Sequence, residues 1–408
     1  MSLNSTPNSE RVYIGIFGKT NAGKSSLINA ITGQELAIVS KISGTTTDPV
    51  SKAMELLPLG PVVMIDTPGL DDNSELGVQR IEKSYEVLDR TDIAVLLVDG
   101  VAGVDQTELD LLTRIEEKKI PHIIVVNKSE QLDDITRERI AHQIPKGKHL
   151  IFVSAQTGEH ISELKEMMAA QLAKQEQEKH IIADLLEPED IVVLVVPIDS
   201  AAPKGRLILP QQQTIRDILE AGAQAIVTRE TELKAAFASL KKPPKMVVTD
   251  SQAFASVSGD TPKEVLLTSF SILFSRYKGN LKNQIQGVKA LDKLKDGDKI
   301  LISEGCTHHR QCDDIGTVKL PKWILEYTGK KVEFVYTSGM TFLKNLSDYA
   351  MVVHCGGCML NEREMKSRIA VAAQQGVPMT NYGMVIAYVH GILKRSLAVF
   401  PEIAQILE

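Results

Sequence analysis

The stretch GKTNAGKS, which runs from Gly18 to Ser25, decides the fold of this chain. It follows a β-rich run at residues 11–17 and opens a helix-like segment at residues 24–31, which is the context that a phosphate-binding loop requires. Gly18 and Gly23 let the backbone curl so that its N–H groups face the phosphates. The start of the helix adds positive potential. The stretch therefore predicts an α/β domain that binds a nucleoside triphosphate.

Further side chains suited to phosphates and Mg²⁺ lie in and after this loop. Lys24 is expected to reach the β- and γ-phosphates, and the Ser25 hydroxyl is expected to hold Mg²⁺. Asp66 follows an apolar, strand-like run and can hold Mg²⁺ through water, while Gly69 can offer its N–H to the γ-phosphate. Thr46 lies in a polar loop and can ligate Mg²⁺ only when the γ-phosphate is present, which makes a switch.

Two motifs that follow later strand-like runs are suited to the base. Asn127 and Lys128 begin the sequence NKSE, which ends at Glu130, and Ser154 and Ala155 follow the next run. All these motifs, in this order, resemble the small GTPases of the translation-factor-related class, most of all the tRNA-modification and ribosome-assembly branch. The residues expected to bind GTP or GDP with Mg²⁺ are Gly18, Asn21, Gly23, Lys24, Ser25, Ser26, Thr46, Asp66, Gly69, Asn127, Lys128, Glu130, Ser154 and Ala155.

The resemblance covers residues 10–172, and two positions depart from the family pattern. The family reads guanine with Asn-Lys-x-Asp, whose Asp accepts two hydrogen bonds from the base. Glu130 has the same carboxylate on a longer stem, so we expect guanine specificity with weaker affinity. Leu70 stands where GTPases that orient water with a Gln carry that residue, so we expect slow intrinsic hydrolysis.

Asn21 has two interpretations of equal weight. In the tRNA-modification GTPases that the loop resembles, an Asn at the matching position helps to hold a potassium ion beside the phosphates. Such a cation could substitute for an arginine finger. Asn also tolerates turn geometry well, which explains the residue without a metal role. The residues expected to be catalytic are Lys24, Asn21 and Thr46.

Composition and charge indicate a globular chain without a dominant nucleic-acid-binding surface. The chain has 408 residues, of which 43% are hydrophobic and 24% charged, with a net charge of -6 and a pI of about 5.9. The N-terminus shows no signal-sequence pattern, and the longest apolar runs are too short to span a bilayer. We expect a soluble cytoplasmic protein with neither a membrane nor a nucleic acid as partner.

Strand-like and helix-like segments alternate along the chain, which predicts an α/β fold of three domains with a mainly parallel sheet in the first. The middle domain contains no chemical motif. In the C-terminal domain, cysteines follow strand-like runs, where open α/β sheets place their sites. The expected boundaries are a disordered N-terminus at 1–10, a GTPase domain at 11–172, a linker at 173–186, a middle domain at 187–270 and a C-terminal domain at 271–408. The apolar runs expected as strands of the first domain, after residues 11–17, are 62–65, 93–98, 123–126 and 151–153.

All four cysteines fall between residues 306 and 358, which indicates metal ligands rather than a disulfide framework. Cys306 and His308 form a Cys-x-His pair, and the later stretch HCGGC contains His354, Cys355 and Cys358. A Cys-x-x-Cys turn brings two sulfurs to one metal centre. Spacing alone leaves a structural zinc site and an iron–sulfur cluster equally open, and a redox Cys-x-x-Cys pair is a weaker third interpretation.

The combination of a GTPase domain, a middle α/β domain and a Cys-x-His…His-Cys-x-x-Cys domain resembles the iron–iron hydrogenase maturation GTPase (HydF) family over essentially the whole chain. The resemblance implies a 4Fe–4S cluster held by Cys306, Cys355 and Cys358. It also implies a scaffold that receives a diiron precursor assembled with two radical-SAM maturases and delivers it to apo iron–iron hydrogenase. Dimerisation through residues 187–270, or a higher homo-oligomer, and cluster binding by residues 271–408 belong to the same implication.

Three residues are candidates for the fourth iron ligand. His308 and His354 stand beside ligand cysteines, although hydrogen bonding to a ligand or surface placement is a slightly stronger interpretation than direct ligation for both. Glu304, two residues before Cys306, points to the same face by β-alternation and is a weak, exchangeable iron ligand, or else a solvated carboxylate. Cys312 falls outside the motif and is interpreted as a bystander thiol, with a nearby spare ligand as the alternative.

The leading hypothesis is a slow GTPase whose nucleotide state gates the interactions of a cluster-binding domain. A zinc-containing regulatory GTPase of ribosome or tRNA processing is the main alternative, and the acidic balance disfavours it. A cluster-dependent redox enzyme is a weaker alternative, because no flavin or nicotinamide fingerprint is found.

Overall fold

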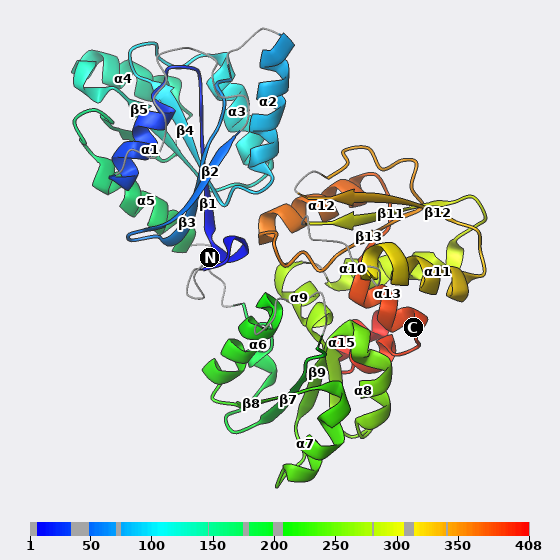
Figure 1. Cartoon of the computed structure of the whole chain (residues 1–408). Coiled ribbons are helices and arrows are strands. Elements are labelled where there is room, and N and C mark those ends of the chain that lie inside the picture. Colours follow the sequence, from blue (N-terminus) through cyan, green and yellow to red (C-terminus); the bar gives the residue numbers. More distant parts are fainter. Residues whose placement is uncertain are drawn as a thin grey trace. The chain divides into compact units, whose positions relative to one another are not determined.

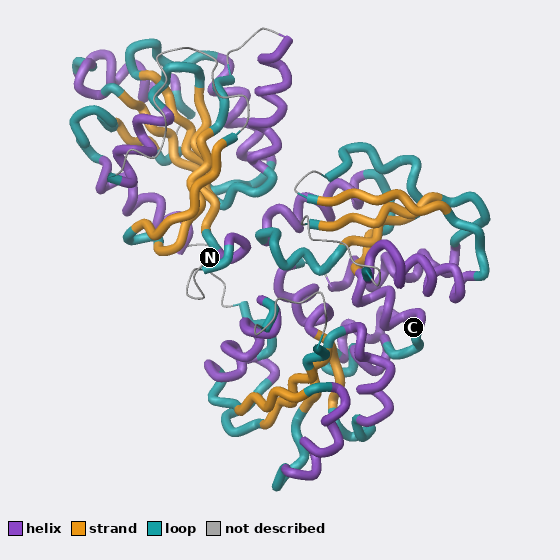
Figure 2. The backbone as a smooth tube through the Cα atoms, in the orientation of Figure 1, coloured by secondary structure: helices purple, strands orange, loops and turns teal. Residues whose placement is uncertain are grey.

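A computed structural model of the chain divides into two compact units, a first unit of residues 1–177 and a second unit of residues 178–408 (Figure 1 and Figure 2). Each unit is described by itself. Among the residues that the structure describes, no helix is long and apolar enough to cross a membrane. The described residues are 6–33, 49–70, 75–145, 147–173, 179–198, 207–279, 281–305, 314–339 and 342–407.

The first unit is built on a six-stranded sheet with the order β2-β3-β1-β4-β5-β6, in which only the β2–β3 pair is antiparallel. All five predicted strands are confirmed, because their apolar runs are buried on both faces of the sheet. β2 was not predicted, since this edge strand is mostly exposed and its apolar residues are interrupted by polar ones. The strands are β1 (Val12–Gly18), β2 (Val50–Leu56), β3 (Gly60–Asp66), β4 (Ile93–Asp99), β5 (His122–Asn127) and β6 (Leu150–Phe152).

Helices cover both faces of this sheet. Leu27 of α1 and Leu164 of α5 belong to one hydrophobic cluster, while Val87 of α2, Leu111 of α3 and Ile140 of α4 belong to the other. The sheet therefore has the two-sided cover that places loops at the carboxyl ends of its strands. The helices are α1 (Lys24–Thr32), α2 (Glu75–Leu88), α3 (Gln106–Glu117), α4 (Asp134–Gln143) and α5 (Ile161–Ala173), with short turns η1 (Asn8–Glu10) and η2 (Ser129–Gln131).

The second unit contains two parallel four-stranded sheets, with the orders β10-β9-β7-β8 and β12-β11-β13-β14. β10 and β14 are only four and three residues long. The strands are β7 (Ile191–Val195), β8 (Gln224–Thr228), β9 (Met246–Thr249), β10 (Leu266–Ser269), β11 (Lys299–Glu304), β12 (Glu333–Ser338), β13 (Met351–His354) and β14 (Met379–Asn381).

One hydrophobic core runs through both sheets of the second unit. Val193 of β7 and Ile302 of β11 belong to it, together with Leu273 of α9, Ile285 of α10 and Val385 of α13. The boundary predicted between 270 and 271 stays a prediction, and it falls inside this continuous core. The helices are α6 (Leu209–Glu220), α7 (Leu233–Ser239), α8 (Phe254–Asp260), α9 (Phe270–Lys278), α10 (Leu281–Val288), α11 (Leu320–Thr328), α12 (Glu362–Gln374), α13 (Tyr382–Val389), α14 (Leu393–Ser396) and α15 (Pro401–Ala404). The short turns are η3 (Ala183–Leu185), η4 (Glu230–Glu232), η5 (Ser251–Ala253), η6 (Lys289–Lys293), η7 (Ile315–Lys319) and η8 (Gln405–Leu407).

Candidate functional site

The phosphate-binding loop joins the end of β1 to the start of α1, as the sequence predicts. Gly23 caps the helix with φ 93°, and Asn21 has φ 63°, so both residues lie in the left-handed region. A Cβ atom added to Gly23 would lie 2.3 Å from Nδ2 of Asn127. Only glycine fits there, because the position requires a positive φ and leaves no room for a side chain.

The side chains predicted to bind the phosphates and Mg²⁺ converge on this loop. Nζ of Lys24 donates hydrogen bonds to the carbonyl oxygens of Gly18 and Lys19, at 3.0 and 2.7 Å. Oγ of Ser25 donates to Oδ2 of Asp66 at 2.7 Å. Burial raises the pKa of Asp66, and the bond from Ser25 and the charge of Lys24 lower it. A hydroxyl and a carboxylate that meet beside the loop are suited to a Mg²⁺ ion.

Asn127 connects the loop to the base-binding motifs. Its Nδ2 donates to the carbonyl oxygen of Ala22 at 3.0 Å, and its Oδ1 accepts from the backbone N–H of Ala155 at 3.0 Å. The side chain is buried, so both hydrogen bonds lie away from water. Lys128 has φ 65°, and its Nζ donates to Oδ2 of Asp99 at 2.6 Å. Asn127 therefore ties the phosphate-binding loop to the segment that begins at Ala155.

Glu130 presents its carboxylate on the exposed side of this motif. A hydrogen bond from the Ser154 hydroxyl lowers the pKa of Glu130, while the slight burial of its carboxyl raises it. The Ser154 oxygen in turn accepts from the backbone N–H of Thr157 at 3.0 Å. An ionised carboxylate in this position can accept two hydrogen bonds from one base edge.

The structure describes Gly69 and Ser26 of the remaining predicted nucleotide residues, and also Leu70. A Cβ atom on Gly69 would lie 2.1 Å from Oγ1 of Thr20, so the Asp-Thr-Pro-Gly segment lies directly against the loop. Leu70 is 5% exposed and belongs to a hydrophobic cluster, so its side chain cannot orient a water molecule. Ser26 is half-buried in the first turn of α1, and Thr46 lies outside the described residues.

The sequence did not predict an ion-pair cluster that anchors the loop to α3. Nζ of Lys19 contacts Asp105 and lies 3.3 Å from Oε2 of Glu108. Asp105 and Glu108 form a capping box at the start of α3. Burial raises the pKa of Glu108 to about 7. The D-x-x-E spacing could have revealed the helix cap, but not its contact with Lys19.

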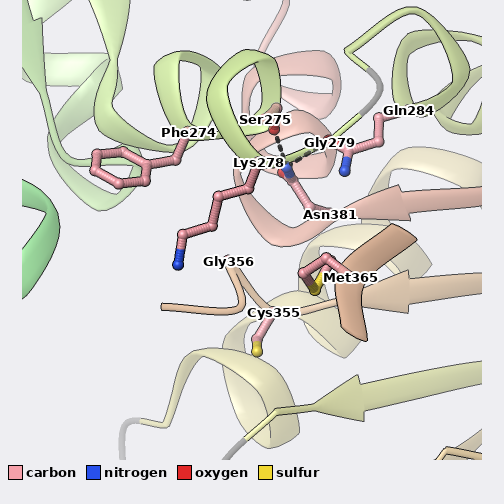
Figure 3. Close-up of a pocket in the computed structure, with 9 residues that line it drawn as sticks. All are labelled: Phe274, Ser275, Lys278, Gly279, Gln284, Cys355, Gly356, Met365 and Asn381. Atoms are coloured by element: carbon pink, nitrogen blue, oxygen red, sulfur yellow. Dashed lines mark hydrogen bonds between the residues drawn. The ribbon is translucent and has the colours of Figure 1, made fainter. Parts of the chain in front are cut away.

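The Cys-x-x-Cys loop follows β13 in the second unit. Sγ of Cys355 accepts hydrogen bonds from the backbone N–H groups of Gly305 at 3.1 Å and Gly357 at 3.4 Å. Cys355 and Cys358 are free thiols, and burial raises the pKa of both. Figure 3 shows Cys355 below Gly356 at the edge of a small pocket. Backbone N–H groups that point at a sulfur are suited to stabilising a thiolate.

Glu304 ends β11 beside this loop and is 3% exposed. The hydroxyl of Tyr382 donates to its Oε1 at 3.3 Å, and burial raises the pKa of Tyr382 above its usual range. The Glu304 carboxylate also raises the pKa of Cys355, after the larger effect of burial. The solvated-carboxylate interpretation of Glu304 is therefore wrong, because the side chain is buried and accepts a hydrogen bond.

Both ring nitrogens of His354 form hydrogen bonds within the protein. Nε2 lies 3.0 Å from Nη1 of Arg368, which can only donate, so Nδ1 carries the proton and donates to the carbonyl oxygen of Cys355 at 2.7 Å. Burial lowers the pKa of His354 to about 4, which keeps the ring neutral. This arrangement supports the interpretation of His354 as a hydrogen-bonding neighbour of a ligand.

The other predicted cluster residues, Cys306, His308 and Cys312, lie outside the described residues. Within the part of the chain that the structure describes, no group of three or more His, Cys, Asp or Glu side chains could hold a metal ion. Two of the three predicted thiolates are thus described, with Glu304 beside them.

Comparison with known families assigns the two halves of the second unit. Residues 181–279 match the hydrogen maturase F dimerization domain, and residues 282–399 match the hydrogen maturase F tetramerization domain. The chain belongs to the hydrogen maturase F (HydF) family. Residues 13–128 match a family described as 50S ribosome-binding GTPase, so the first unit of this HydF chain is a P-loop GTPase domain. The predicted fold class, a P-loop GTPase domain followed by two α/β domains, is confirmed.

Two curated relatives each match less than half of the chain. GTPase Der from Microcystis aeruginosa is 32% identical over 198 residues, which are 44% of this chain and 43% of that protein. The tRNA modification GTPase MnmE from Laribacter hongkongensis is 35% identical over 161 residues, 39% of this chain and 34% of that protein. The chain thus spans less than half the length of these relatives. Among solved structures, a single-residue variant of Era from Aquifex aeolicus, bound to GDP.AlF4-, has 18% identity and a TM-score of 0.37, covering 53% of this chain and 93% of that one.

Proposed function

We propose that the chain is a GTP-hydrolysing carrier that holds a 4Fe–4S cluster, receives a diiron precursor and delivers it to apo iron–iron hydrogenase. One observation carries the proposal: a HydF chain combines a P-loop GTPase site with a half-buried Cys-x-x-Cys loop whose first sulfur accepts two backbone N–H groups. The nucleotide pocket and the loop lie in different compact units. Nucleotide state and cluster state can therefore be varied separately.

On the nucleotide side, Lys24 exchanges its two carbonyl partners for the β- and γ-phosphates, because charged phosphate oxygens are the stronger acceptors. Ser25 and Asp66 would hold Mg²⁺ in place of the hydrogen bond between them, and Thr46 would add a ligand when the γ-phosphate is present. Glu130 accepts hydrogen bonds from guanine. Hydrolysis is slow, because the buried Leu70 side chain cannot orient the attacking water. A potassium ion beside Asn21 would offset this loss by supplying the positive charge that an arginine finger supplies in other GTPases.

On the cluster side, Cys306, Cys355 and Cys358 provide three thiolates, and Glu304 is the preferred candidate for the fourth iron. The described residues fit such a group: the Cys355 sulfur accepts two N–H groups, and the buried Glu304 offers an oxygen ligand that iron exchanges readily. When bound, the cluster supplies an iron with one exchangeable position. His354 and Arg368 orient the loop through the Cys355 carbonyl oxygen.

The proposed partners follow from the family rather than from the site. They are two radical-SAM maturases, which assemble the diiron precursor, and the apo-hydrogenase that receives it. Homo-oligomers form through the segments 181–279 and 282–399, as the descriptions of the matching domains imply.

Activation of apo-hydrogenase tests the proposal directly. The full chain is purified after co-expression with both maturases and mixed with apo iron–iron hydrogenase, and hydrogen evolution is measured. We expect activation by the natural chain and by Cys312→Ser, which changes a cysteine outside the motif, and none by Cys355→Ser. Full activation by Cys355→Ser, or none by the natural chain, would contradict the proposal.

A further inference from the structure

A buried lysine lies against the Cys-x-x-Cys loop. Lys278 is the last residue of α9 and is 6% exposed, and its Nζ donates to the carbonyl oxygens of Leu360 at 3.1 Å and Gly357 at 3.4 Å. Figure 3 shows its side chain extended along the pocket that Cys355 and Gly356 also line. A lysine is seldom buried to this degree, because the ammonium group loses its hydration.

The ammonium of Lys278 interacts electrostatically with the second cysteine of the loop. The two carbonyl oxygens that accept from its Nζ belong to Gly357 and Leu360, which flank Cys358, so the ammonium lies beside this part of the loop. The positive charge therefore favours the thiolate, which is the form that binds metal. In low-dielectric surroundings a charge acts more strongly than at the surface.

A buried hydrogen-bond network fixes the position of this charge. Nδ2 of Asn381 donates to Oγ of Ser275 at 2.5 Å and to Oε1 of Gln284 at 2.9 Å. Oδ1 of Asn381 accepts from the backbone N–H of Met384 at 2.8 Å, which caps α13. Ser275 lies one turn before Lys278 on α9, as Figure 3 shows. The end of α9 is thereby tied to α10 and α13, so the ammonium is held at one place.

We propose that Lys278 is a positioning residue that raises the reduction potential of the cluster by holding a positive charge against its thiolate ligands. The inference rests on the proposed cluster site. Reduction of a bound 4Fe–4S cluster adds one electron, supplied in the experiment by dithionite, and so adds one negative charge. A fixed positive charge nearby stabilises the reduced state, and net charge is one of the factors that set such potentials.

Lys278 and the two cysteines belong to different family segments. Lys278 lies one residue before the end of the segment that matches the dimerization domain, while both cysteines lie in the segment that matches the tetramerization domain. The contact thus links the two family segments within one compact unit. A displacement of α9 would move the Lys278 ammonium and so change the electrostatic potential at the cluster.

The test is a redox titration of the full chain, reconstituted anaerobically with iron and sulfide and followed by EPR. Lys278→Met removes the charge with little change of shape, Lys278→Arg keeps it, and Lys289→Met is the matched control. Lys289 also donates to a backbone carbonyl oxygen, that of Ile406 at 2.6 Å. At the natural chain's midpoint, we expect Lys278→Met to lower the ratio of reduced to oxidised cluster about tenfold, which is about 59 mV for one electron. The arginine variant and the control should keep the natural potential.

Each result supports or overturns the inference. An unchanged potential in Lys278→Met, or an equal drop in Lys289→Met, would overturn it. If Lys278→Met assembles no cluster, the potential of Lys278→Arg is the deciding measurement. A lowered potential in this variant, which keeps the charge, would contradict the role of the charge. The same potential as in the natural chain would support it. A natural chain that binds no iron–sulfur cluster would refute the proposed function itself, which is a different result.

Discussion

Glu364→Ala is expected to destabilise the second unit far more than an exposed substitution on the same helix. Oε1 of Glu364 accepts from Nε of Arg368 at 2.8 Å, and the two side chains are 9% and 1% exposed. Removal of one partner leaves a buried charge without its counter-ion, which costs about 3–5 kcal/mol. In a unit of this size, each kcal/mol lowers Tm by about 2–4 °C, so we expect a loss of about 6–20 °C.

The chain contains one tryptophan, which makes the assay specific to this unit. Trp323 lies in α11 of the second unit, where its ring packs edge-on against His390 at 5.4 Å between ring centroids. Urea unfolding of the full chain, followed by tryptophan fluorescence, therefore reports the stability of the second unit alone. The midpoint and slope give the free energy of unfolding for each variant.

Glu362→Ala is the matched control, because Glu362 lies on the same turn of α12. Its side chain is partly exposed and pairs with Lys179 at 2.6 Å and Lys366 at 2.5 Å. Exposed pairs of this kind contribute about 0–1 kcal/mol. A loss below about 1 kcal/mol in Glu364→Ala, or an equal loss in the control, would refute the reasoning that the Glu364–Arg368 pair is a buried charge pair.

Three further predictions concern the nucleotide site. Lys24→Ala should abolish GTP hydrolysis, measured as phosphate release, and leave the iron–sulfur spectrum intact, because the sites lie in different units; loss of the spectrum would contradict the separation. Hydrolysis should be faster in potassium than in sodium chloride if Asn21 holds a cation, and equal rates would exclude that role. The pKa of Glu108 is raised from 4.5 to about 7 in the folded chain. The protonated carboxyl therefore makes its whole contribution to the free energy of unfolding below pH 4.5, and this contribution is lost as the pH rises through 7. The free energy of unfolding of Glu108→Gln, minus that of the natural chain, should therefore rise by up to about 3 kcal/mol between pH 4.5 and pH 8. Calorimetry of the first unit's transition measures this difference, and a difference that does not change with pH would contradict the raised pKa.

Several features of the fold were predictable because a local pattern determines them. The parallel strands of the first unit are continuous apolar runs, and the GKTNAGKS loop requires a strand before it and a helix after it. The meeting of Ser25 and Asp66 follows from the same logic, since β1 and β3 are neighbours in parallel register. Motif order along the chain was therefore sufficient to predict the loop between β1 and α1 and the strand that carries Asp66.

Tertiary burial was not predictable from the sequence. Lys278 ends a helix and Arg368 stands four residues after Glu364, and both patterns are typical of solvent-exposed helices. Both side chains are nevertheless buried beside the Cys-x-x-Cys loop. The contact between Lys19 and Asp105 is likewise invisible in the sequence, because it joins segments 86 residues apart. Residues that support a site from distant elements are the ones that motif reasoning misses.

The metal content of the chain tests the central claim most directly. The full chain and Cys355→Ser are purified anaerobically, iron, sulfide and zinc are measured, and visible absorption and EPR spectra are recorded. The account predicts a brown protein with about four irons and four sulfides per chain, and a sharp loss of both in Cys355→Ser. A colourless protein with stoichiometric zinc, or full iron content in Cys355→Ser, would contradict it.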